Sequence, residues 1–424
     1  MSAEDKGSKD SPRGREAGTY TEKGIHWLNR NVVGISLTSL FSDMSHEMAT
    51  AVLPFLIIFD LGGSAAIVGL VEGLSDGASS AVKSYSGYLS DRIGQRTPIM
   101  YLGYAITGAL IPAIGFATSW LEVLALRVGG WMGRGSRGPP RDALLTESVP
   151  SGAVGKAFGF QRAMDTTGAV LGSGIALLLL LLIPHVAYST VFFVSFAPGV
   201  ASVIVVVVLV REVRHGKRFE PKSFRASVGS LPRTFKLFLV GVGLFGISNF
   251  SNVIFTLRAE QVLQPSLGQV DAATFAVLLY VVLNIVYAVA SFPVGHLADR
   301  VSKRKLLAAG YAVFALACLA SAFEAPSLLA LAPIFILAGL QAAIVDTVEG
   351  AYAAELLGES HRGSGFGVLQ TINGVGDFTS SALIGVMITF VSSWLGFALL
   401  ASLAVIAAGV LLVLTRGGDR VAVP

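Results

Sequence analysis

Long apolar runs recur along most of the chain, and they limit its possible folds more than any other feature. A membrane interior about 30 Å thick needs about 20 apolar residues per helix, and twelve runs reach that length. Because the runs are continuous rather than alternating, they exclude a β-barrel and predict an all-α membrane protein with twelve transmembrane helices. The runs cover residues 33–59, 66–90, 98–118, 121–140, 156–183, 187–210, 235–258, 271–294, 305–323, 327–350, 363–388 and 393–415.

The charge content supports a membrane protein and argues against an enzyme. Charged residues make up 14% of the chain, against about 25% in soluble proteins. Cys318 is the only cysteine, so no disulfide can form within the chain. The sequence has no phosphate-binding loop, no His-Glu-x-x-His motif and no cysteine cluster. We therefore expect no enzymatic activity, no metal and no cofactor.

The basic residues predict the orientation of the helices. If the N-terminus is cytosolic, most of the 31 lysines and arginines fall in segments on the cytosolic side. This rule explains the basic isoelectric point without a nucleic-acid partner. We expect a multi-pass protein of the cell (inner) membrane, with both termini cytoplasmic.

A repeated unit predicts two six-helix halves. The stretch from Gly87 to Arg96 recurs from Gly295 to Arg304, 208 positions later. The Gly-x-x-x-Gly stretch that begins at Gly155 recurs at the same offset, from Gly363. Two matches at one offset predict duplication about an axis along the membrane normal. The expected segments are a disordered cytosolic tail (1–30), an N-terminal bundle (31–210), a basic cytosolic linker (211–233), a C-terminal bundle (234–416) and a tail (417–424).

The pattern Gly-x-x-x-Asp-Arg-x-Gly-x-Arg at 87–96 resembles the signature of the major facilitator superfamily. Around Arg127 the sequence partly resembles the helix 4 motif of proton-driven members, whereas helix 5 lacks the motif of drug/proton antiporters. The stretches 36–43 and 138–144 resemble a prokaryotic group whose substrates are largely unassigned. The resemblance implies two pseudo-symmetric six-helix bundles and a cavity lined by helices 1, 4, 7 and 10.

The repeated motif is also the expected cytosolic gate. The loop between helices 2 and 3 is short, so its acid should sit at the end of helix 2. The family resemblance implies that the start of helix 11 lies close to it. We expect Asp142 to pair with the arginines of this loop. The predicted gate residues are Gly87, Asp91, Arg92, Gly94, Arg96, Asp142, Asp299, Arg300 and Arg304.

Ionisable residues within the runs are functional candidates, because charge inside a membrane is costly. Helical rise places Glu47, Glu72 and Arg127 at one level, and Asp43 and Asp76 near the midplane. We predict that Glu47 and Glu72 form the proton site and that Arg127 adjusts their affinity for protons. The two aspartates are the second candidate for the proton site. The alternative is a structural ion pair that locks two helices.

Neutral polar residues predict the substrate cavity in the second half. Two acids of the first half have an asparagine at the equivalent position of the second half, 208 residues later. These amides supply hydrogen bonds to substrate or, alternatively, join helices. The predicted cavity residues are His46, Arg127, Asn249, Asn252, Asn284, Tyr287, Asn373 and Asp377.

These features together predict a secondary active transporter that moves a small organic solute by alternating access and is coupled to protons. Two alternatives stay open: a proton-independent facilitator or uniporter, and a non-transporting membrane sensor. The expected partners are a small-molecule substrate, protons and the lipid bilayer, and we expect a monomer.

Overall fold

Helices form all the regular structure in the part of the chain that is described. The computed structural model describes residues 27–150, 153–183, 187–213, 231–298, 300–323, 327–357 and 362–414. The predicted tails and most of the predicted linker lie outside these ranges. Within the ranges, the all-α membrane fold is confirmed.

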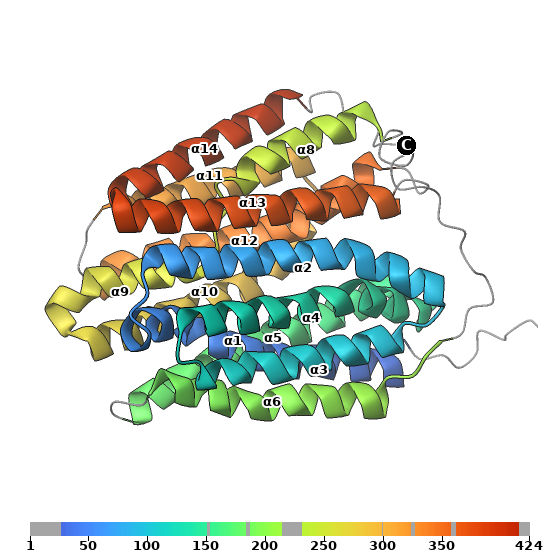
Figure 1. Ribbon diagram of the computed structural model, residues 1–424. Coiled ribbons are helices and arrows are strands. Elements are labelled where there is room, and N and C mark those ends of the chain that lie inside the picture. The colour runs from blue at the N-terminus through green and yellow to red at the C-terminus, as the bar shows by residue number, and fades with distance from the viewer. Residues whose placement is uncertain are drawn as a thin grey trace, which may run out of the picture.

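The first half of the chain contributes six long helices, shown in Figure 1. Two of them run on into short elements, the π-helix η1 (Leu56–Asp60) after α1 and the 3₁₀-helix η2 (Ile114–Phe116) after α3. The long helices are α1 (Arg30–Phe55), α2 (Ala65–Ile93), α3 (Thr97–Ala113), α4 (Trp120–Glu147), α5 (Val154–Leu182) and α6 (Tyr188–Leu209).

The second half contains seven helices within the described ranges, because its first membrane crossing is divided in two. Starts of corresponding helices recur at the offset of 208: α4 and α12 begin at Trp120 and Leu328, and α5 and α13 at Val154 and Arg362. Superposition of the two halves stays a prediction. The helices are α8 (Arg233–Gly246), α9 (Val253–Leu267), α10 (Gln269–Ala298), α11 (Lys303–Ala322), α12 (Leu328–Leu356), α13 (Arg362–Phe390) and α14 (Ser393–Leu414).

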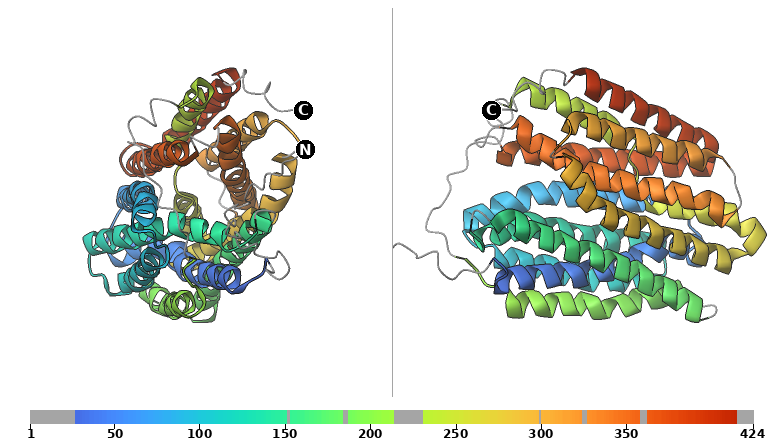
Figure 2. Two further views of the ribbon diagram at one scale, coloured as in Figure 1. Left: turned by 90° about the vertical axis from the view of Figure 1, so that its right-hand side faces the viewer. Right: turned by 180° about the vertical axis from the view of Figure 1, so that it is seen from behind.

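The two halves form two bundles that lie side by side (Figures 1 and 2). They meet along α2 with α13 and along α5 with α10. Helix α6 ends and α8 begins at one end of the molecule, which we call the linker end, and we call the opposite end the far end. Seven described helices are long and apolar enough to cross a membrane by length and composition alone; α1, α2, α4 and α13 carry more polar residues.

The predicted seventh run, 235–258, is interrupted at its centre. Helix α8 ends at Gly246 and α9 begins at Val253, so Asn249, Ser251 and Asn252 lie in or beside irregular backbone. Helix α13 supplies hydrogen bonds there, since Ser380 Oγ donates to the Asn249 carbonyl at 2.9 Å and the Ser251 amide donates to Ser381 Oγ at 3.1 Å. Irregular backbone is tolerated at membrane depth where protein surrounds it in this way.

Helix α4 is longer than the sequence predicted. The predicted run ends at residue 140, but α4 continues to Glu147 with Pro139 and Pro140 inside it. Arg134, Arg137 and Arg141 are therefore helical residues. The count of basic residues assigned them to the cytosolic segment between helices 4 and 5, whereas the structure places them within α4. Prolines are tolerated in membrane helices because neighbouring groups bind the freed carbonyls.

Small residues bring α2 and α13 into close contact in the half of the molecule nearest the far end. A Cβ atom on Gly69 would collide with the carbonyl oxygen of Ser381, and one on Gly73 would lie 2.8 Å from that of Phe378. A Cβ on Gly77 has more room, because it would meet the Gly374 carbonyl oxygen at 3.5 Å. Close approach through glycine is typical of helix pairs in membranes.

Hydrogen bonds between the halves lie from the middle of the helices to the far end. Among the described residues, four such bonds are present: Ala66 amide to Thr389 Oγ1 (2.8 Å), Ser251 Oγ to Glu72 (2.8 Å), Tyr280 hydroxyl to Glu47 (2.7 Å) and Asn284 amide to Ser173 Oγ (3.4 Å). The structure therefore shows the halves joined at the far end.

Candidate functional site

Two adjacent cavities lie between the halves. The central cavity measures about 260 Å³ and is lined by Glu47, Glu72 and Arg127 among others. The linker-side cavity measures about 350 Å³ and is lined by Lys83 and Glu349 among others. Both are lined by Asn249, Asp346 and Asp377. Their volumes are close to the lower end of the range for small-molecule pockets.

Arg127 and Glu72 form a buried ion pair at the wall of the central cavity. Arg127 Nε and Nη2 donate to the same Glu72 oxygen at 3.1 and 2.8 Å, and Nη2 also donates to Thr50 at 3.1 Å. The Arg127 guanidinium lies 3.8 Å from the centre of the Trp131 ring. The Arg127 side chain is fully buried, so the pairing and the aromatic face replace part of the water that it lost, while its Nη1 has no hydrogen-bond partner among the described residues.

Glu47 lines the same cavity, but its partners are not those that the sequence led us to expect. Its Oε2 accepts a hydrogen bond from the Tyr280 hydroxyl of α10 at 2.7 Å, and its Oε1 lies 3.9 Å from His46 Nε2. No ion pair joins Glu47 to Arg127 in the described structure. Glu72 also reaches the second half, because its Oε2 accepts from Ser251 at 2.8 Å. Both predicted proton acceptors are thus bonded across the interface between the halves.

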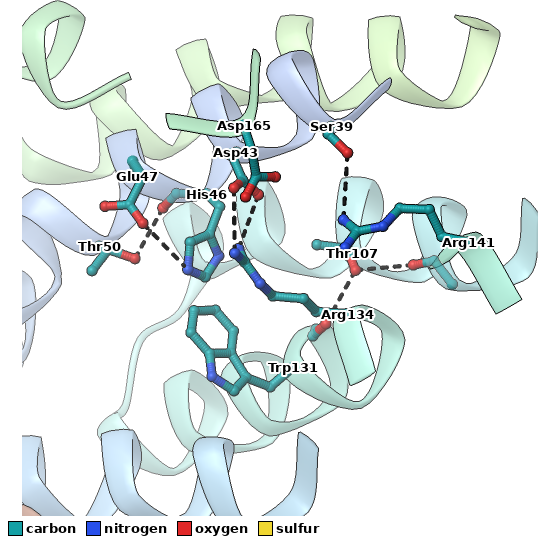
Figure 3. A network of polar contacts seen from close by, with 12 residues as sticks. Ser39, Asp43, His46, Glu47, Thr50, Thr107, Trp131, Arg134, Arg141 and Asp165 are labelled. Atoms are coloured by element: carbon teal, nitrogen blue, oxygen red, sulfur yellow. Dashed lines mark hydrogen bonds and ion pairs between the residues drawn. The ribbon is translucent and has the colours of Figure 1, made fainter. Parts of the chain in front are cut away.

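The two predicted midplane aspartates lie apart, each with its own partner on α4. Trp131 Nε1 donates to Asp76 Oδ1 at 2.6 Å. Arg134 pairs with Asp43, with Nη1 3.1 Å from Oδ1 (Figure 3). His46 lies against Trp131 with ring centres 3.9 Å apart, so this tryptophan separates the two acids.

Two charged residues beside the site, Arg134 and Asp165, are not among the site residues predicted from the sequence, although Asp165 is an ionisable residue within a run. Arg134 was counted with the cytosolic segment after helix 4, although its spacing of seven from both Arg127 and Arg141 is the signal of one helix face. Asp165 of α5 lies beside Asp43 (Figure 3) and pairs with Arg162 at 3.3 Å. This cluster extends the charged network from the cavity toward the linker end.

Three predicted polar residues of the second half, Asn249, Tyr287 and Asn373, bond to side chains of that half that were not predicted to line the cavity. Gln341 donates to Asn249 at 3.2 Å, the Tyr287 hydroxyl donates to Asp346 at 2.8 Å, and Asn373 donates to Glu349 at 2.5 Å. Of the predicted cavity residues, Asn284 and Tyr287 are not among those lining the two cavities. Those that line them are His46, Arg127, Asn249, Asn252, Asn373 and Asp377.

The predicted gate motif is anchored within its own half in the described contacts. Arg96 Nη2 pairs with Glu147 at 3.3 Å and Nη1 donates to Ser90 at 2.6 Å, while the Arg96 amide donates to Glu212 at 2.9 Å. The expected pairing of Asp142 with these arginines is wrong, because Asp142 binds its neighbour Arg141 at 2.9 Å. Helix α4 continues through residue 142, which orients this side chain differently from a loop.

The remaining gate residues have varied surroundings. Gly94 ends α2 with a left-handed φ of 72°, which glycine adopts without strain, and Gly87 lies beside Pro139. Arg92 and Arg300 are exposed, and Arg304 donates to the Leu412 carbonyl at 3.4 Å. Asp299 and the side chain of Asp91 lie outside the described residues, so the gate role stays a prediction.

A charged cavity between two helical bundles, embedded in an apolar exterior, defines a multi-pass membrane transporter. The sequence pattern of the Major Facilitator Superfamily matches residues 35–282 and 237–423. The chain belongs to this superfamily.

Known proteins similar to this chain include relatives in archaea and bacteria. An uncharacterised MFS-type transporter of Methanocaldococcus jannaschii is 32% identical over 84% of this chain and 88% of its own. The multidrug resistance protein MdtH of Cronobacter sakazakii is 31% identical over only 29% of this chain and 32% of its own.

Two solved structures share the fold. A bacterial homologue of the human lysosomal transporter Spinster, in an inward-facing and occupied conformation, has a TM-score of 0.70 and 18% identity, over 91% of this chain and 96% of its own. The nucleoside transporter NupG has a TM-score of 0.73 and 12% identity, over 91% of this chain and 99% of its own.

Proposed function

We propose that this chain is a secondary active transporter that moves a small organic solute by alternating access, coupled to protons through Glu47 and Glu72. The observation that carries the proposal is that both carboxylates, which belong to the first half, accept hydrogen bonds from the second half. A site that senses protons therefore also holds the two halves together. Alternating access requires such a link between occupancy and conformation.

The sign of the coupling follows from the strength of these bonds. A hydroxyl bonds more strongly to an ionised carboxylate than to a neutral carboxyl group. Ionised Glu47 and Glu72 hold Tyr280 and Ser251, and so favour the conformation in which the far end is closed. Protonation weakens both bonds, so proton uptake and opening of the far end favour each other.

The test measures far-end opening without needing a known substrate. Spin labels at Asp60 and Gln264, on opposite halves at the far end, report the distance between the halves in the Cys318→Ala background. We expect mildly acidic pH to increase the population with the longer distance. Glu47→Gln and Glu72→Gln should each produce that population at alkaline pH, and the double variant should lose the response to pH.

A matched control removes an exposed carboxylate near the far end, as Asp271→Asn in α10, and should keep the wild-type pH response. Tyr280→Phe should open the far end at all pH values, because it removes the donor to Glu47. A wild-type distance distribution that does not change with pH would exclude coupling through this pair.

A proton-independent facilitator is the second candidate, and the Arg127–Glu72 pair favours it. That pair joins α4 to α2 within one half and is almost completely buried, as expected of a structural lock. In this case the label distance of the wild type would not change with pH, and Glu72→Gln would lower the stability of the protein.

A further inference from the structure

The acids of the two cavities outnumber the bases. Six carboxylates line them in the described structure, against three side chains of lysine or arginine. Two of the bases are already paired: Arg127 with Glu72, and Arg162 with Asp165, which lies outside the cavity lining. Lys83 is then the one cavity base without an ion pair within 4 Å among the described residues. Counted as formal charges, the acids of the two cavities exceed the bases by three.

Three aspartates concentrate this excess where the cavities adjoin. Asp346 and Asp377 line both cavities, and Asp76 lines the central one. They come from α12, α13 and α2, and no described basic group lies within ion-pair distance of any of them. Two of them accept hydrogen bonds from neutral groups, Asp346 from the Tyr287 hydroxyl and Asp76 from the Trp131 indole. Charged groups within a membrane normally have a partner. Lys83 is the basic group that faces all three aspartates, but it makes no ion pair with any of them within 4 Å in the described structure.

A second, independent feature of the central cavity also indicates a missing ligand. His46 lines this cavity, its side chain is 5% exposed, and its Nδ1 has no hydrogen-bond partner among the described residues. Figure 3 shows the ring between Glu47 and Trp131. A buried polar atom without a partner is costly unless a bound molecule or water satisfies it.

The arrangement of the acids distinguishes an organic cation from a metal ion. In the described ranges, no three His, Cys, Asp or Glu side chains converge closely enough to hold a metal. The carboxylates are spread over several helices, and aromatic side chains, Trp131, Tyr280 and Phe250, lie among them in the central cavity. Separate carboxylates and aromatic faces suit an organic ammonium or guanidinium group.

We propose that the solute is an organic cation whose positive group binds between Asp76, Asp346 and Asp377, with its apolar part in the central cavity. This inference rests on the proposed transport function and specifies its substrate class. Lys83 lines the linker-side cavity with Asp346 and Asp377. Its ammonium group competes with the solute for these carboxylates, so removing it should strengthen binding.

The test measures binding to the purified full-length protein by calorimetry, with probes that share one indole body. Tryptamine is the cation, N-acetyltryptamine its neutral analogue, and indole-3-propionate the anion. Spermidine and tetraphenylphosphonium extend the series to a flexible and a bulky cation. We expect at least one of the three cations to bind, and tryptamine to bind at least about tenfold more tightly than its two analogues.

The variants give effects of opposite sign. Asp377→Asn and Asp346→Asn should each weaken the binding of the best cation by about tenfold or more, while Lys83→Met should strengthen it. Asp271→Asn, an exposed change outside the cavities, should leave the affinity as in wild type, and the unfolding temperature of each variant verifies its folding.

Three results would overturn the proposal: no cation binds at millimolar concentration, the neutral or anionic probe binds as tightly as tryptamine, or Lys83→Met weakens cation binding. The measurement is made at equilibrium and at one pH. Its failure is therefore distinguishable from failure of proton coupling, which the far-end distance reports independently.

Discussion

Replacing Arg127 with methionine is expected to lower the free energy of unfolding by about 3–5 kcal/mol, because it leaves the buried Glu72 carboxylate without its counter-charge. Arg127 is fully buried and donates twice to Glu72 and once to Thr50. Thermal or denaturant unfolding of the purified protein in detergent measures the loss. A change of this size is at the upper end of single-residue effects.

The double variant Arg127→Met with Glu72→Gln distinguishes charge from packing. If the uncompensated carboxylate causes the loss, neutralising it should restore a large part of the stability. Equal instability of the single and double variants would contradict this account and assign the cost to the lost contact of Arg127 with the Trp131 ring.

A single methyl group on Gly69 is expected to shift the conformational equilibrium away from far-end closure. The added Cβ would collide with the Ser381 carbonyl across the seam between α2 and α13, and overpacking of this kind costs about 1–3 kcal/mol. The far-end-closed population should therefore fall by about tenfold or more relative to the open one. The labels at Asp60 and Gln264 would report a longer distance in Gly69→Ala.

Gly77→Ala, two turns further along the same face of α2, is the matched control. A Cβ at Gly77 meets Gly374 at 3.5 Å, an ordinary van der Waals distance. Both changes reduce backbone freedom in the same helix by the same amount. An equal shift in the two variants would show that helix propensity, and not the close approach at Gly69, controls the equilibrium.

Some features of the site could be predicted from the sequence because they are local. The acids Glu47 and Glu72 stand out in an apolar run whatever the fold, since burial of charge is rare and costly in a membrane. Helical rise correctly brought Glu72 and Arg127 together, because both helices cross the same membrane thickness. The same argument did not predict that Glu47 bonds to Tyr280, which is 233 positions away.

The end of α4 shows where local rules failed. The apolar run that the sequence showed ends at residue 140, but α4 continues to Glu147 with Pro139 and Pro140 inside it, as neighbouring helices allow in membranes. That continuation turns Arg134 from a loop charge into the partner of Asp43, and it leaves Asp142 paired with Arg141. A propensity for stopping a helix is a weak local preference, and tertiary contacts override it.

The sequence by itself determined the all-α membrane fold, because a segment in lipid must satisfy its own backbone hydrogen bonds and so becomes a helix according to its length and apolarity. Only the tertiary structure decided the partner of each polar side chain and the break between Gly246 and Val253. Those outcomes depend on the rotation and register of helices distant in sequence. The shapes of the packed side chains and the close approach of helices at residues such as Gly69 set that register. It therefore cannot be predicted from the sequence of one helix alone.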